Sequence, residues 1–68
     1  MKIKIRLREI LAEREISQRQ FALSMNMRIA TVNHLCSENV DRVYLRTLEQ
    51  ICDALEIDIS ELVVTEKG

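Results

Sequence analysis

The chain of 68 residues has a formal net charge of −1, 47% apolar residues, two cysteines, one glycine and no proline. This length allows one small domain, which buries only about 60% of its unfolded surface and for which oligomerisation is a natural support. The apolar content argues against disorder, and no apolar run approaches the ~18 residues needed to cross a bilayer. We therefore expect residues 1–68 to form a single cytoplasmic domain.

Short segments near both ends favour β-structure. Lys and Ile alternate with period two from Lys2 to Ile5, and Val63-Val64-Thr65 is rich in β-branched residues. These segments are predicted to pair as a two-stranded ribbon, either within one chain or across a dimer. The alternative is a frayed basic arm at the N-terminus.

The remainder of the chain has the apolar spacing of helices. The periodic positions are Leu7, Ile10 and Leu11; Phe21, Ala22 and Met25; Val32 and Leu35; Leu48, Ile51, Cys52 and Leu55; Ile59, Leu62 and Val63. Two helix starts have a capping-box spacing, Ser17 with Gln20 and Asp58 with Glu61. The start of the fourth helix, near Tyr44-Leu45, has no good cap. The fold is thus predicted to be mainly helical.

The distribution of charge is uneven. Residues 1–37 hold seven Lys/Arg against three Glu, a net charge of +4, whereas residues 38–68 hold three Lys/Arg against eight acids, a net charge of −5. From Ile16 to Ser37 there is no carboxylate at all. A surface that faces phosphates must shed negative charge, so this window is a candidate for contact with nucleic acid.

The same window meets the requirements of a helix-turn-helix motif. Ala22 provides a small residue midway along the first helix, where the second must cross closely. Four positions later, Asn26 can take the positive φ that the turn needs. Val32 and Leu35 supply apolar anchors for the second helix.

Helical geometry then predicts which residues of the second helix face outward. With Val32 inward and about 100° per residue, Asn33 lies near 100°, Ala30 near 160° and His34 near 200°. Ile29 lies on the border at roughly 60°, but at the helix N-terminus, where base contacts concentrate in this motif. The outward face is therefore free of acids, as a helix that reads a DNA groove requires.

The segment Ser17-Gln-Arg-Gln-Phe-Ala, followed by Asn26-Met-Arg-Ile-Ala-Thr-Val-Asn-His-Leu35, resembles the phage Cro/repressor (XRE-type) helix-turn-helix family. The stretch from Leu45 to Leu62 does so as well, and the match covers about residues 6–63. The resemblance implies an all-α, five-helix domain, with the ribbon as an addition, and a helix-turn-helix at about residues 17–36. It also implies binding of double-stranded DNA, commonly as a homodimer.

The resemblance implies a set of DNA-contacting positions. Gln18 is similar to the family's phosphate-binding glutamine, and Arg42 to a loop position often basic and near phosphate. The expected DNA-binding residues are Gln18, Arg19, Arg28, Ile29, Ala30, Asn33, His34 and Arg42. The family usually has glycine where this chain has Glu15, Asn26, Glu38 and Glu56, and Glu38 falls in a loop that should approach phosphate.

The sequence contains no residue pattern typical of a catalytic site or a metal site. Cys36 and Cys52 are interpreted as reduced thiols that pack as small hydrophobes, because a zinc site needs four ligands and His34 is the one histidine. There is no nucleophile–base set and no glycine-rich phosphate loop, so we expect neither an enzyme nor a bound cofactor.

These observations favour a sequence-specific DNA-binding transcriptional regulator. An alternative is a protein-interaction module on the same fold, such as an antitoxin or an anti-repressor-like partner, that no longer binds DNA. The near-neutral net charge, Glu38 and the apolar pair Ile29-Ala30 favour that alternative.

Overall fold

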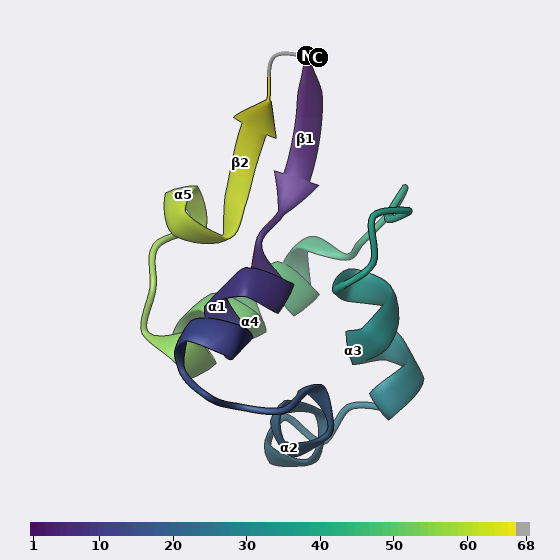
Figure 1. Ribbon diagram of the computed structural model, residues 1–68, viewed down its shortest axis with the longest axis vertical. Coiled ribbons are helices and arrows are strands. Elements are labelled where there is room, and N and C mark those ends of the chain that lie inside the picture. The colour runs from purple at the N-terminus through teal and green to yellow at the C-terminus, as the bar shows by residue number, and fades with distance from the viewer. Residues whose placement is uncertain (67–68) are drawn as a thin grey trace.

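The computed structural model describes residues 1–66. Within them the chain forms five helices and a two-stranded ribbon (Figure 1). In chain order the elements are β1 (Lys2–Ile5), α1 (Leu7–Glu13), α2 (Gln18–Ser24), α3 (Ile29–Leu35), α4 (Leu45–Leu55), α5 (Ile59–Leu62) and β2 (Val63–Glu66). The mainly helical fold predicted from the apolar spacing is confirmed.

The ribbon forms within one chain. β1 pairs antiparallel with β2, in a register that sets Lys2 opposite Glu66 and Ile5 opposite Val63. At its base the Arg6 N–H donates to the Leu62 carbonyl at 2.7 Å. Ile5 and Val63 pack against the helical core, which anchors the base of the ribbon on the helices (Figure 1). The β-ribbon alternative is thus correct, and residues 2–5 are not a frayed arm.

One hydrophobic core joins the helices. Its buried members are Leu7, Ile10, Leu11, Phe21, Ala22, Val32, Leu35, Cys36, Leu48, Ile51, Leu55 and Leu62. Every helix contributes at least one of them, at the spacing that the sequence predicts. Full burial of each Leu, Ile or Phe is worth about 1.5–3 kcal/mol, so this cluster provides the main favourable term in the folding of a domain of this size.

Three helices end in the same hydrogen-bonded motif, built around a left-handed residue. Glu15, Asn26 and Glu56 have φ of 56°, 55° and 54° at the ends of α1, α2 and α4. In each case the next residue donates its N–H to the carbonyl five residues back, as Ile16 does to Leu11 at 2.9 Å, the pattern of a Schellman motif. These next residues, Ile16, Met27 and Ile57, all pack against the core. The positive φ predicted for Asn26 is confirmed.

Two helix starts are capped as predicted. Ser17 Oγ accepts from the Gln20 N–H, and Gln20 Oε1 accepts from the Ser17 N–H, both at 3.0 Å. Asp58 and Glu61 form the equivalent box at the start of α5. α3 and α4 begin after Arg28 and Tyr44, neither of which makes a capping hydrogen bond through its side chain. The sequence also predicts this absence for α4.

Candidate nucleic-acid interface

α2, a tight turn and α3 form a helix-turn-helix. Ala22 is fully buried in α2, which lets α3 pack closely across it. The left-handed Asn26 then reverses the chain, and the Met27 N–H donates to the Ala22 carbonyl at 2.8 Å. Val32 and Leu35 hold α3 on the core. The two helices lie at one end of the molecule, away from the ribbon (Figure 1).

α3 presents an exposed face without carboxylates. Arg28, Ala30, Asn33 and His34 are all exposed, and Ile29 retains 40% of its surface accessible to solvent. The border position assigned to Ile29 from helical geometry therefore agrees with its partial exposure.

Two further predicted residues lie at the start of α2. Gln18 is half-buried and Arg19 is exposed. Gln18 opens the helix directly after the Ser17 cap, so the capping box fixes the backbone from which both side chains project. This arrangement places one amide and one guanidinium in the first turn of the helix that packs against α3.

The loop between α3 and α4 carries the last predicted residue. Arg42 is exposed and lines a hollow of about 310 Å³ together with His34 and Thr31 of α3. The structure thus brings Arg42 and His34 to one depression, although they are eight positions apart. Glu38, in the same loop, is exposed and lines a second hollow, beside β1, that Arg42 also lines.

Two residues on this side escaped the sequence prediction. Thr31 is exposed on α3 and lines the hollow with Arg42. Helical geometry could have predicted the exposure of Thr31, because Thr31 and Asn33 lie about 100° from Val32 on opposite sides of the helix. Tyr44, directly before α4, is 82% exposed and also lines the hollow. In the sequence, Tyr44 is distinguished only as an aromatic residue at a helix start without a capping side chain, which does not predict that it lines a hollow with Arg42.

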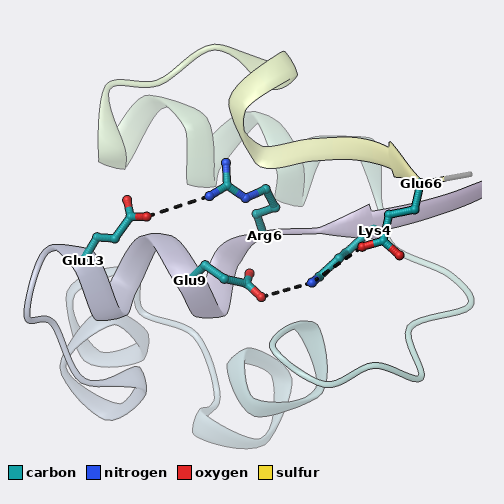
Figure 2. A network of polar contacts seen from close by, with 5 residues as sticks. All are labelled: Lys4, Arg6, Glu9, Glu13 and Glu66. Carbon is teal, nitrogen blue, oxygen red and sulfur yellow. Dashed lines mark ion pairs between the residues drawn. The ribbon is translucent and has the colours of Figure 1, made fainter.

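The ion pairs of the described residues lie around β1 and α1, outside this face. Lys4 Nζ is 3.3 Å from Glu9 Oε1 and 3.8 Å from Glu66 Oε1, and Arg6 Nη2 is 3.8 Å from Glu13 Oε1, as Figure 2 shows. Within residues 1–66, Arg19, Arg28 and Arg42 take part in no ion pair. No carboxylate of these described residues therefore neutralises their three charges by direct pairing.

Titration of two carboxyl groups follows their contacts. Burial raises the pKa of Glu9. Hydrogen bonds from its own backbone N–H and from Lys4 lower it, as do the positive charges of Lys4 and Arg6, and the net result is a pKa below the ordinary value. Hydrogen bonds from the Ser60 hydroxyl and N–H lower the pKa of Asp58. Both groups are thus ionised at neutral pH.

The cysteines pack as hydrophobic residues. Cys36 is buried and Cys52 half-buried, both as free thiols. Burial raises the pKa of each thiol, and nearby carboxylates raise it further. Within the described chain, no three His, Cys, Asp or Glu side chains are grouped in a way that could hold a metal ion. Among the same residues, no helix has the length and apolarity to cross a membrane.

The geometry is that of a helix-turn-helix protein, and comparison with known proteins identifies its family. The chain belongs to the family of Cro/C1-type helix-turn-helix DNA-binding domains, which it matches over residues 6–68. The resemblance to Cro/repressor proteins is thereby confirmed. The chain is also similar to the crystal structure of a candidate DNA-binding protein from Bacteroides fragilis, with a TM-score of 0.80 and 24% identity over 93% of this chain and 100% of that chain. At this identity the likeness supports the fold alone. No curated protein sequence matches the chain significantly.

Proposed function

We propose that the protein is a sequence-specific DNA-binding transcriptional regulator that inserts α3 into the major groove. The observation that carries this proposal is the exposed, carboxylate-free face of α3, bordered by Arg28. A solvated helix usually carries acids on its outer side, whereas a duplex repels them. Membership of the Cro/C1-type family supports the same function.

The proposed contacts divide into two kinds. Gln18, Arg19, Arg28 and Arg42 bind phosphates and set the register on the duplex. Asn33 reads an adenine through its N6 and N7 atoms, and the apolar Ile29 and Ala30 meet a thymine methyl group. His34 lines one hollow with Arg42 and is a further candidate for contact with the duplex.

The protein acts as a homodimer in this proposal. Two copies of α3 enter successive major grooves about 34 Å apart, so the operator is a palindrome whose half-sites are one helical turn apart. Sedimentation of the protein with a palindromic duplex should give two protomers per duplex. One protomer per duplex would contradict the dimer and leave the role of α3 intact.

The salt dependence of binding tests DNA recognition directly. Arg19, Arg28 and Arg42 would neutralise three phosphates per protomer, whereas the uncharged Gln18 releases no counterion, so the slope of log K against log salt should be about −5 for the dimer. It is measured by mobility shift on DNA selected from random sequences. Arg6→Gln is the matched control, because Arg6 is paired with Glu13 at 3.8 Å and lines neither hollow that contains Arg42, so the slope should stay unchanged.

Absence of any shift at about 50 mM salt, where electrostatic binding is strong, would overturn the proposal. Recovery of a stable complex with another protein under those conditions would instead favour an interaction module on the same fold.

A further inference from the structure

An apolar groove lies between α4 and α5. It encloses about 500 Å³, and its floor includes Leu48, which is buried, and Val63, which is half-buried. Leu45 and Ile59 form its walls and remain 77% and 48% exposed. Burial of a large aliphatic side chain is favourable, and these two side chains receive only part of that stabilisation from the chain itself.

The rim of this groove is acidic. Glu49, Asp53 and Asp58 line it, and no Lys or Arg does. Among residues 1–66 none of the three takes part in an ion pair, and the hydrogen bonds that Asp58 accepts from Ser60 keep it ionised. On α4 the apolar and acidic positions share one face, because Leu45, Leu48, Glu49, Cys52 and Asp53 follow the three-and-four spacing of a helix.

We propose that this groove binds an amphipathic basic helix of a second protein. Aliphatic side chains on one face of that helix cover Leu45 and Ile59, while Lys or Arg on its flanks meet the acidic rim. This is helix-in-groove recognition, in which apolar anchors supply affinity and the charged rim selects the partner.

The charge of the rim decides against other occupants. A second copy docking through the same groove about a two-fold axis would bring two sets of three carboxylates together, at a cost in repulsion. DNA and anionic membranes are excluded by the same sign of charge. α5 lies on the opposite side of the helical core from α3 (Figure 1), so a helix seated against Ile59 lies away from the proposed DNA-binding face. The site is therefore independent of the proposed DNA binding.

A designed peptide tests the groove. The probe is a fluorescein-labelled helix of ~18 residues made of Leu and Lys, with the leucines on one face, and its binding is followed by anisotropy. A peptide of the same composition, shuffled so that the leucines surround the helix, serves as the ligand control. We expect the amphipathic peptide to bind and the shuffled peptide to bind at least about tenfold more weakly.

Variants locate the binding. Leu45→Ser and Ile59→Ser should each weaken the amphipathic peptide about tenfold, while Leu23→Ser, a change at an apolar residue of α2 that is 66% exposed, should not. Glu49→Gln combined with Asp53→Asn should weaken binding most at low salt. Circular dichroism of each variant establishes that it folds.

Equal binding of both peptides, or equal affinity of the Leu45→Ser and Leu23→Ser variants, would overturn the proposal. So would sedimentation that shows a dimer of the free protein that is lost in Leu45→Ser, because the occupant would then be a second copy. Mobility shifts of Ile59→Ser should match those of the unmodified protein, which separates this result from any failure of DNA binding.

Discussion

Replacing Glu56 by glycine should stabilise the protein, because Glu56 is held in the left-handed region at φ 54° and ψ 47°. A residue with a Cβ atom pays roughly 1–2 kcal/mol there, a strain that glycine lacks. Glycine in turn loses more backbone entropy on folding, about 0.5–1 kcal/mol. The expected net gain in the free energy of unfolding is about 0.5–1 kcal/mol. For a domain of this size, 1 kcal/mol raises Tm by roughly 4–8 °C.

Thermal and urea unfolding followed by circular dichroism would measure this gain. Residues 38–68 carry a net charge of −5, so removal of one carboxylate is itself a possible cause of stabilisation. Glu56→Gln separates the two effects, because it removes the charge and keeps the Cβ atom. Glu49→Gly removes a carboxylate from the interior of α4 and should destabilise by about 1 kcal/mol.

The outcome discriminates between strain and charge. If Glu56→Gln raises Tm as much as Glu56→Gly, relief of repulsion is the cause and the strain at this position is negligible. If Glu56→Gly lowers Tm, the interpretation of the end of α4 is wrong. Glu15, with φ 56° at the end of α1, offers an independent repetition of the same experiment.

Three further outcomes are expected. Asn33→Ala should cost about 1–3 kcal/mol at one base position, measured on a panel of single-base operator variants; an equal loss on all of them would argue against a base contact. Arg19→Ala should weaken binding to every sequence alike and reduce the salt slope by about one per protomer, and an unchanged slope would separate Arg19 from the phosphates. Because the folded pKa of Glu9 lies below its ordinary value of 4.5, its stabilising contribution is present above that pH and lost as the pH falls through the folded pKa. Glu9→Gln should therefore be less stable than the unmodified protein at neutral pH, by a difference in unfolding free energy that shrinks on acidification; a constant difference would contradict this origin.

The local features of the fold could be predicted from the sequence alone. The apolar spacing predicts helices around Leu7, Phe21 and Leu48, and both capping boxes have the spacing that the structure shows. These features depend on residues three or four positions apart, so the information lies within one or two helical turns. The outward face of α3 follows from the same geometry once Val32 is taken as its anchor.

Other features depend on contacts between distant parts of the chain. The sequence leaves open whether β1 pairs with β2 of its own chain or of another, because β-propensity does not specify a partner; the anchoring of Ile5 and Val63 on one core settles it. The resemblance places glycine at four positions, and Glu15, Asn26 and Glu56 adopt positive φ without it, whereas Glu38 does not. No local pattern in the sequence reveals that a glutamate occupies the left-handed region.

For the two proposed binding surfaces, the face around α3 and the groove between α4 and α5, the sequence predicts charge and the tertiary structure determines shape. The absence of carboxylates from Ile16 to Ser37 can be read from the sequence, and it predicts which side would face an anionic partner. The hollow shared by Arg42, His34 and Tyr44, and the groove between α4 and α5, exist only after the loop and helices are packed. Composition determines the charge of a surface, but its shape depends on which segments the core brings together.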